Sequence, residues 1–265
     1  TWATWATGLE NGKAFRRMML RNMNWRGWNR NFSERLAPSE PLAFQKKDLI
    51  FGKKSAMEIL TQIPLTIEER LEYGEEMRIP ATWEEFLDAL EDCEYRIEYD
   101  ENQIISFMGY ATQAHETLMA KIVRLIGNLL NEDLFTVCGS NLALHIPGFV
   151  RRYYNADCTV IKGESQYVTL RGDMQAVANP VLIVEVLSMS TRDFDLGRKF
   201  RNYRSIPSLQ QVLFIESTEM LVVSHIRSSG SNRWILEEFS KPGDQIPILG
   251  EGSISMKELY KKINV

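Results

Sequence analysis

The feature that most constrains this chain is a short apolar run, Pro180–Leu187, that contains a single carboxylate. The run is too short for a typical helix and is rich in β-branched residues, so it predicts a central strand covered on both faces. Glu185 is therefore expected to be buried. Because an unpaired buried carboxylate costs several kcal/mol, a metal ion, a Lys or Arg, or a proton must meet Glu185 in the folded chain.

The segment after this strand offers a cation for Glu185. Turn residues follow the strand, and the spacing of apolar and basic residues predicts a helix over 192–205. On that helix Asp195 and Lys199 lie four residues apart and share one face. If the helix packs back over the strand, Lys199 reaches the strand end that holds Glu185. The alternative is a solvated surface pair of Asp195 and Lys199, which stabilises a helix only slightly.

A second carboxylate, Asp157, stands near the start of a predicted strand over 156–161. If this strand lies beside Pro180–Leu187, Asp157 and Glu185 approach closely and repel each other unless a divalent cation or a proton intervenes. Carboxylate oxygens with one lysine and few imidazoles suit Mg²⁺ or Mn²⁺ better than Zn²⁺. For Asp157 taken alone, an ordinary residue at a strand end is the simpler interpretation.

Composition and charge exclude several classes of protein. Of the 265 residues, 44% are hydrophobic and 25% are charged, which is typical of a globular domain. The formal net charge of −4 argues against a protein that coats nucleic acid through its overall charge, although a local basic surface is compatible with it. Three widely spaced cysteines indicate neither a disulfide framework nor a zinc cluster.

The same features predict a cytoplasmic protein with no membrane partner. No apolar run approaches the roughly 20 residues that span a bilayer, and the beginning of the chain lacks the apolar core of a signal peptide. The sequence does not fix the oligomeric state, and a homodimer is compatible with it.

Residues 1–80 differ from the rest and are interpreted as an N-terminal extension. The stretch 15–35 holds six arginines against one acid, with aromatic residues between them. This is the composition of an arm that neutralises phosphates and stacks bases, and the candidate nucleic-acid contacts are Arg16, Arg17, Arg21, Arg26 and Arg30. The stronger alternative is that Met and Trp side chains of this stretch form the apolar stripe of a helix that docks on the main domain or a partner.

The compact domain is predicted over 81–265 and has a mixed α/β pattern. A capping-box pair, Thr82 and Glu85, begins a short helix. Further helices are expected from His115 onward, over 192–205 and over 255–263. The expected strands are 95–99, 103–108, 134–137, 142–146, 156–161, 180–187, 211–216, 220–226 and 233–239. The stretch 162–179 is long for a connection without structure, so it is a functional loop or contains a short element.

Several motifs in a fixed order resemble those of one family. They are TWEEFL at 82–87, RIEY at 96–99, MGYATQAH at 108–115, AD at 156–157, PVLIVEVLS at 180–188, and the segment from Asp195 through Lys199 to Tyr203. On these motifs, residues from about 82 to 217 resemble the Uma-two family of restriction-endonuclease-like proteins, within the PD-(D/E)xK nuclease superfamily. The resemblance does not account for residues 1–80.

The resemblance implies a restriction-endonuclease-like core and a set of site residues. Asp157 corresponds to the first metal-binding acid of the superfamily and Glu185 to the second. Leu187 stands where the superfamily usually has a lysine, and Lys199 on the next helix resembles the relocated lysine of Uma-like sequences.

Two further positions match the family near its site and are accessory candidates, Glu98 and His115. The acidic-glycine turn of the family is replaced here by Asp100, Glu101 and Asn102. For His115, a helix-start histidine bonded to the backbone is an equally good interpretation.

The implied function is a metal-dependent endonuclease that hydrolyses phosphodiester bonds, with DNA as the expected nucleic acid. Asp157 and Glu185 would hold Mg²⁺ or Mn²⁺, which activates water and neutralises charge on the phosphate. Lys199 would orient or deprotonate that water, or stabilise the phosphorane-like state. The alternative is a catalytically silent nuclease-like fold that serves as a nucleic-acid or protein interaction module. Hydrolysis of a phosphodiester outside nucleic acids is a third hypothesis.

Overall fold

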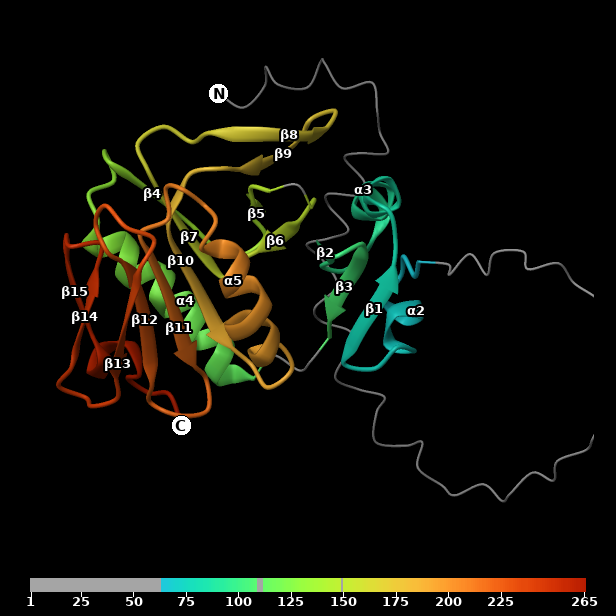
Figure 1. Cartoon of the computed structure of the whole chain (residues 1–265). Coiled ribbons are helices and arrows are strands. Elements are labelled where there is room, and N and C mark those ends of the chain that lie inside the picture. Colours follow the sequence, from blue (N-terminus) through green and yellow to red (C-terminus); the bar gives the residue numbers. More distant parts are fainter. Residues whose placement is uncertain (1–62, 109–111, 149) are drawn as a thin grey trace, which may run out of the picture. The chain divides into compact units, whose positions relative to one another are not determined.

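The computed structural model describes residues 63–108, 112–148 and 150–265 (Figure 1). This part of the chain is a mixed α/β fold with a seven-stranded sheet, a six-stranded sheet and a two-stranded sheet. The α/β class predicted from the sequence is confirmed. The proposed N-terminal arm and its candidate arginines lie outside the described residues.

The seven-stranded sheet has the order β1-β3-β2-β6-β5-β9-β8. In that order its strands are Glu76–Pro80, Gln103–Phe107, Glu98–Asp100, Tyr153–Asn155, Ala143–His145, Met174–Val177 and Tyr167–Arg171. The long stretch 162–179 thus contains the β8–β9 pair. Glu101 and Asn102 both have positive φ (47° and 60°), so the turn between β2 and β3 forms without the glycine of the family pattern.

Two elements lie ahead of residue 81, where the compact domain was predicted to begin. Helix α2 (Ile67–Leu71) is followed by strand β1, which pairs antiparallel with β3 along its whole length. Strand β1 buries only Met77 and Ile79 and ends in a proline, so it carries a weak strand pattern. Strand β1 therefore belongs to the same sheet as the hairpin β2–β3 that follows it.

The six-stranded sheet contains the central strand and has the order β13-β12-β11-β10-β7-β4. In that order its strands are Trp234–Phe239, Val222–Arg227, Gln211–Glu216, Pro180–Leu187, Cys158–Lys162 and Phe135–Cys138. Strand β10 runs parallel to β11 and antiparallel to β7. All eight residues of β10 are buried, as the apolar run predicted.

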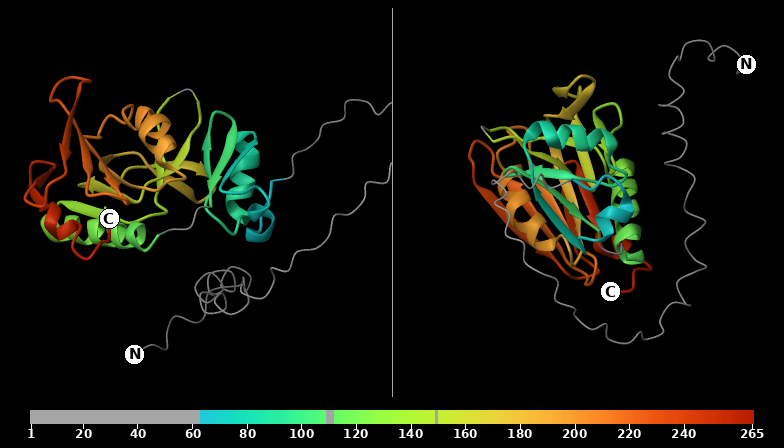
Figure 2. Two further views of the ribbon diagram at one scale, coloured as in Figure 1. Left: turned by 90° about the horizontal axis from the view of Figure 1, so that it is seen from below. Right: turned by 90° about the vertical axis from the view of Figure 1, so that its right-hand side faces the viewer.

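Helices cover both faces of this sheet, as the views in Figure 2 show. Helix α4 (Gln113–Leu129) packs on one face, where it meets Leu182 and Val184 of β10. On the other face, η1 (Phe194–Lys199) and α5 (Phe200–Tyr203) meet Ile183 and Leu187. Because side chains alternate along a strand, Glu185 shares the face of Ile183 and Leu187 and lies toward η1 and α5.

Helix α3 (Trp83–Asp92) begins where the capping-box pattern predicted. The Thr82 hydroxyl accepts a hydrogen bond from the backbone N–H of Glu85 (3.2 Å), and the Glu85 carboxylate accepts one from the backbone N–H of Thr82 (2.7 Å). Both unpaired donors at the helix start are thereby satisfied. The apolar face of α3 packs on β1, β2 and β3.

The helical segment after β10 differs in detail from the single helix predicted. Its first part, η1, is a π-helix, in which the Phe200 backbone N–H donates to the carbonyl of Asp195 five residues earlier. Near the end of the chain, β14 (Gln245–Ile248) and β15 (Gly252–Ser255) form the two-stranded sheet. Helix α6 (Met256–Leu259) is shorter than the expected helix over 255–263, because the chain leaves the helical conformation at Tyr260.

The described residues include no helix that is both long and apolar enough to cross a membrane.

Candidate active site

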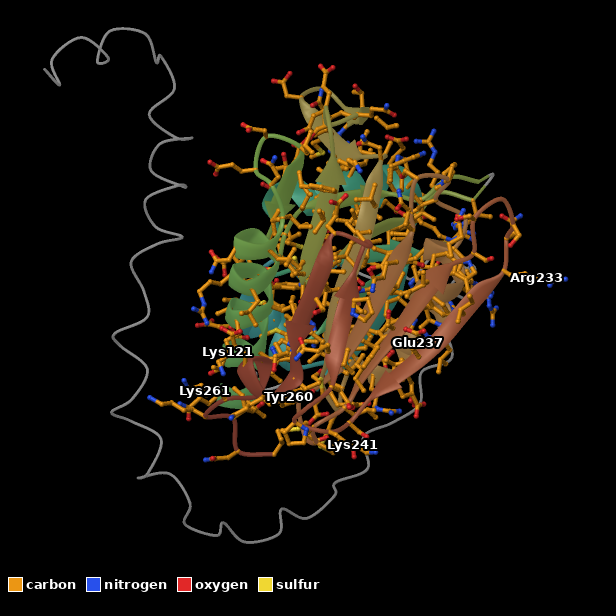
Figure 3. The ribbon with its side chains drawn as sticks, turned by 90° about the vertical axis from the view of Figure 1, so that its left-hand side faces the viewer. Lys121, Arg233, Glu237, Lys241, Tyr260 and Lys261 are labelled. Atoms are coloured by element: carbon orange, nitrogen blue, oxygen red, sulfur yellow. The ribbon has the colours of Figure 1, made fainter. Side chains whose placement is uncertain are left out.

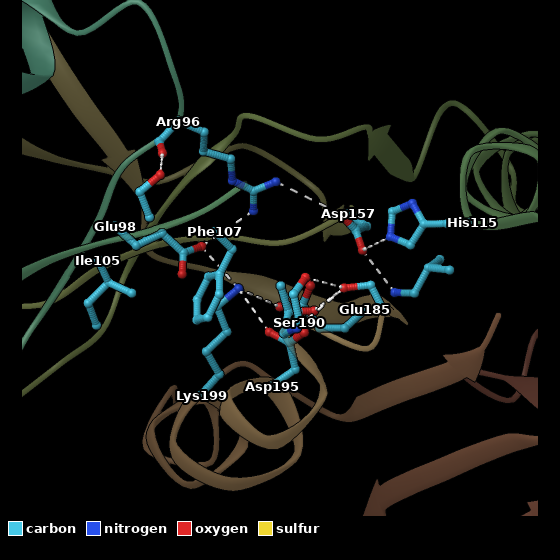
Figure 4. Close-up of a pocket in the computed structure, with 14 residues that line it drawn as sticks. Arg96, Glu98, Ile105, Phe107, His115, Asp157, Glu185, Ser190, Asp195 and Lys199 are labelled. Atoms are coloured by element: carbon cyan, nitrogen blue, oxygen red, sulfur yellow. Dashed lines mark hydrogen bonds and ion pairs between the residues drawn. The ribbon is translucent and has the colours of Figure 1, made fainter. Parts of the chain in front are cut away.

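A polar pocket opens at the carboxyl end of β10, where the hairpin β2–β3, the start of α4, and η1 meet (Figure 4). Its volume is about 160 Å³, which is room for a phosphate group or about five water molecules at about 30 Å³ each. Four carboxylates, a lysine, an arginine and a histidine line it. These charged groups come from segments that are far apart in the sequence.

The ammonium of Lys199 lies at the centre of a carboxylate cluster, and its side chain is only 5% exposed. Its Nζ is 3.0 Å from Glu98 Oε1, 3.2 Å from Asp195 Oδ1 and 3.3 Å from Glu185 Oε1. It also donates to the backbone carbonyl of Asn155 at 3.2 Å. The structure therefore brings Lys199 and Glu185 together, and it places Glu98 against the same ammonium.

Burial and charge act in opposite directions in this cluster. Burial raises the pKa of Glu185, and the Lys199 ammonium opposes that rise. Burial likewise raises the pKa of Asp195, again opposed by Lys199. For Lys199, burial alone would lower the pKa, but Glu185, Glu98 and Asp195 outweigh it and raise the pKa above its ordinary value. Lys199 is therefore a fixed cation at neutral pH.

Tyr203 adds a neutral donor to Glu185. Its hydroxyl donates to Glu185 Oε1 at 2.6 Å, from one turn beyond Lys199. Burial, followed by the neighbouring Glu185, raises the pKa of the Tyr203 hydroxyl well above its ordinary value, so it keeps its proton. One oxygen of Glu185 is thus held by both Lys199 and Tyr203.

Asp157 lies between β6 and β7 and faces the same pocket. Because Val184 is opposite Cys158 in the antiparallel pairing of β10 and β7, Asp157 comes opposite Glu185. Asp157 Oδ2 accepts the backbone N–H of Val186 at 2.8 Å, which fixes the carboxylate at the end of β10. Its charge is close enough to Glu185 to contribute to the raised pKa of that residue.

The other oxygen of Asp157 faces an arginine. Arg96 Nη1 lies 3.9 Å from Asp157 Oδ1, and a second guanidinium nitrogen lies 3.4 Å from Glu98 Oε1. The same nitrogen donates to the backbone carbonyl of Asn155. Arg96 is about one-third exposed, so it sits between the buried carboxylates and the open side of the pocket.

His115 lies in the first turn of α4. Its backbone N–H donates to the hydroxyl of Thr112, the N-cap of the helix, at 3.1 Å. The imidazole ring takes no part in that backbone hydrogen bond. Its Nδ1 is 3.3 Å from Glu116 Oε1, and its Nε2 is 4.0 Å from Asp157 Oδ2. The backbone of His115 is thus capped, and its ring lines the pocket.

Glu98 is buried and only partly satisfied. Its Oε1 accepts the backbone N–H of Asn155 at 3.0 Å and meets Lys199 at 3.0 Å. Among the residues that the structure describes, its Oε2 is buried without a hydrogen-bond partner. A buried carboxylate oxygen without a donor is costly, so this atom is a natural acceptor for water or for a ligand group in the pocket.

The donor set of the pocket fits a divalent cation. Four carboxyl groups line the pocket beside two permanent cations, Arg96 and Lys199, so the pocket offers oxygen ligands of the kind that a divalent cation prefers. Within the described ranges, no three His, Cys, Asp or Glu side chains already converge in an arrangement for a metal. Mg²⁺ commonly takes one or two carboxylates and completes its shell with water and phosphate oxygens, so Asp157 and Glu185 are sufficient protein ligands.

Sequence reasoning did not assign Arg96 or Tyr203 to the site, although a signal existed for each. Arg96 and Glu98 are two apart in a strand-like segment and so face the same side. Tyr203 follows Lys199 by four residues and so shares its helix face. Asp195 was considered only as a partner of Lys199, and in the structure it is buried as deeply as that lysine.

The fold is that of a restriction-endonuclease-like α/β protein. The chain belongs to the Uma2 family, described as "Putative restriction endonuclease", whose family model matches residues 83–255. This confirms the predicted family. Residues 63–80, with α2 and β1, lie outside that match.

Similar proteins cover most of the domain. The uncharacterized protein sll1609 of Synechocystis sp. is 32% identical over 154 residues, which is 58% of this chain and 84% of that protein. The uncharacterized protein slr1290 of the same organism is 27% identical over 179 residues, or 67% and 90% of the two chains. A crystal structure from Anabaena variabilis, titled "a putative nuclease belonging to DUF820", superposes with a TM-score of 0.53. It covers 68% of this chain and 98% of its own at 18% identity, and so supports the fold.

Proposed function

We propose that this protein is a metal-dependent endonuclease that hydrolyses phosphodiester bonds in DNA. The observation that carries the proposal is the convergence of Asp157, Glu185 and Lys199 in one pocket from three separate segments. The family description supports a nuclease, and restriction endonucleases act on DNA. The proposed cofactor is Mg²⁺ or Mn²⁺.

Asp157 and Glu185 are the proposed metal ligands. Asp157 is oriented by the Val186 backbone N–H, and Glu185 is oriented by Tyr203 and Lys199. When bound, a divalent cation supplies an attacking water of lowered pKa and neutralises the charge that grows on the phosphate.

Lys199 acts in this proposal as a fixed positive charge. A general base works best when its pKa lies near the operating pH, and the carboxylates around Lys199 raise its pKa instead. The ammonium therefore orients the attacking water and stabilises negative charge in the transition state. Of the roles considered for Lys199, proton abstraction is the least compatible with its surroundings.

Arg96 and His115 are proposed to meet the substrate phosphate. Both side chains line the pocket beside Asp157 and are partly exposed. A guanidinium is suited to phosphate oxygens because it offers several donors in one plane. This would place the phosphate next to the carboxylate pair, with Glu98 serving to hold Lys199.

The competing proposal is an interaction module without catalysis, and one observation favours it. Lys199 pairs with Glu98, Glu185 and Asp195, so the carboxylate cluster has a counter-ion within the protein. A buried network of this kind can serve to specify the fold.

A cleavage assay separates the two proposals. Single-stranded DNA, duplex DNA and RNA are incubated with the protein and Mg²⁺ or Mn²⁺, and wild type is compared with Glu185→Gln and Lys199→Met. We expect metal-dependent cleavage of DNA by wild type and a decrease of roughly 100-fold or more in both variants, the scale expected when one group that stabilises the transition state is removed. Lys241→Met, which removes an exposed lysine outside the pocket, is the matched control and should cleave like wild type.

Two outcomes contradict the nuclease proposal or its site. Equal cleavage by wild type and both variants would mean that Glu185 and Lys199 are not catalytic residues. A correctly folded wild-type protein that cleaves none of the substrates with either metal would favour the interaction module.

A further inference from the structure

A basic groove lies between helix α4 and the C-terminal segment, away from the pocket residues. Besides Ser255, its lining consists of five basic residues and one acid: Lys121, Arg124, Lys257, Lys261, Lys262 and Glu258. Figure 3 shows Lys121 and Lys261 at the same edge of the molecule. Four of the five basic residues are exposed, and Lys121 is partly buried.

The positive charge of the basic groove exceeds its negative charge, which Glu258 alone contributes among the lining residues. In the part of the chain that the structure describes, none of the five basic side chains forms an ion pair. The ammonium of Lys121 instead donates to the backbone carbonyls of Leu259 and Lys261. Some arginines elsewhere on the surface are paired, as Arg171 is with Asp88 at 2.6 Å.

The effect of this crowding is visible at Lys121. Burial lowers the pKa of Lys121, and Arg124, Lys261 and Lys262 lower it further, while Glu258 opposes them. The cations therefore lie close enough to repel one another. In a chain of net charge −4, such a local concentration of positive charge attracts anions.

Helix α4 connects the basic groove to the candidate active site. His115 lines the pocket at the start of the helix, and Lys121 and Arg124 follow six and nine residues later. At about 1.5 Å per residue, these positions lie roughly 9 and 14 Å farther along the helix axis. Measured along the helix axis, the basic groove therefore begins roughly 9 to 14 Å beyond the pocket end of α4.

We propose that the basic groove binds the phosphate backbone of duplex DNA at a distance from the bond held at the active site. The inference rests on the proposed function for the identity of the polyanion and for the position of the cleaved bond. The groove residues would act as point charges on phosphates, which contributes affinity without sequence preference.

The test compares two variants of the full chain that each lose one arginine and one lysine. The groove variant is Arg124→Gln with Lys261→Gln, which leaves Lys121 and its backbone contacts in place. The control variant is Arg233→Gln with Lys241→Gln, two exposed basic residues that Figure 3 shows apart from Lys121 and Lys261. Binding to a labelled 20-base-pair duplex is measured by fluorescence anisotropy in EDTA over a series of salt concentrations.

The groove variant is expected to bind about tenfold or more weakly than wild type at about 0.1 M salt. The slope of log K against log salt should become shallower by about 0.9 for each phosphate that the variant no longer neutralises, and so by up to about 1.8. The control variant should keep the wild-type slope and affinity.

Other outcomes overturn the inference. An unchanged slope and affinity in the groove variant, equal losses in both variants, or absence of duplex binding by wild type would each do so. Binding of anionic phosphatidylserine vesicles that the groove variant loses while it still binds DNA would assign the groove to a membrane surface instead. A groove variant that loses DNA affinity while wild type cleaves no DNA would support the groove and contradict the proposed nuclease.

Discussion

Replacing Lys199 by methionine removes the only ammonium in the carboxylate cluster while keeping a side chain of similar length. Three carboxylates lie between 3.0 and 3.3 Å from Nζ, and the lysine side chain is 5% exposed. Removing one partner from a buried ion pair costs about 3–5 kcal/mol, because the remaining charge is left without compensation. We expect a loss of that size in the free energy of unfolding at pH 7, a large share of the roughly 5–15 kcal/mol of a typical domain.

Urea denaturation at pH 7 measures this loss against two reference variants. Lys241→Met removes an exposed lysine and should change the stability by less than about 0.5 kcal/mol. Lys199→Met combined with Glu185→Met removes one of the stranded carboxylates and should recover part of the loss.

The pH dependence of Lys199→Met provides an independent check. Lys199 is the group that opposes the raised pKa of Glu185 and Asp195, so its removal moves both folded-state pKa values farther above their unfolded values. The folded variant then binds protons more tightly than the unfolded chain, and its stability falls as the pH rises from about 4.5 toward the folded-state pKa. The difference in the free energy of unfolding between wild type and Lys199→Met should therefore be smaller at pH 5 than at pH 7.

A loss below about 1 kcal/mol at pH 7, which is the size expected for an exposed ion pair, would refute this reasoning. A stability difference between wild type and Lys199→Met that is the same at pH 5 and pH 7 would also refute it. Either result would mean that water reaches the Lys199 ammonium and its carboxylates.

Three further predictions concern stability. Tyr203→Phe removes a 2.6 Å donor to Glu185 and should cost about 1.5–3 kcal/mol in urea denaturation; an unchanged midpoint would contradict that hydrogen bond. Thr82→Ala removes the cap of α3 and should cost about 1 kcal/mol, which Thr82→Ser should largely restore. Burial raises the pKa of the Cys93 thiol from 9.0 to about 11, so the unfolded chain ionises first. Stability should fall by up to about 1.4 kcal/mol per pH unit between pH 9 and 11, and an equally steep fall in Cys93→Ala would refute the assignment.

The part of the fold that could be predicted rests on local patterns. A run of apolar, mostly β-branched residues predicted β10. Because side chains alternate along a strand, the position of Glu185 in the run also fixed the face of the sheet on which it lies. A buried carboxylate needs a metal ion, a cationic side chain or a proton, and the lysine of the next helix lies 3.3 Å away. These steps needed only strand alternation, helix spacing and the cost of an unpaired charge.

The remaining features depend on contacts between distant segments. The role of Asn155 could not be predicted from the sequence, because it is the backbone carbonyl of Asn155, and not its side chain, that accepts the hydrogen bond from Lys199. Strand β1 is short and ends in proline, and only its pairing with β3 defines it. The π-helical turn at Asp195 is not specified by helical spacing alone.

The central claim is that Asp157 and Glu185 form a divalent-metal site, and calorimetric titration with Mn²⁺ tests it most directly. Asp157→Asn removes the charge while its amide oxygen can still accept the Val186 N–H. The account predicts saturable Mn²⁺ binding by wild type and its loss in Asp157→Asn and in Glu185→Gln, with Lys241→Met unchanged. Mn²⁺ binding of equal affinity and stoichiometry in wild type and both carboxylate variants would contradict it.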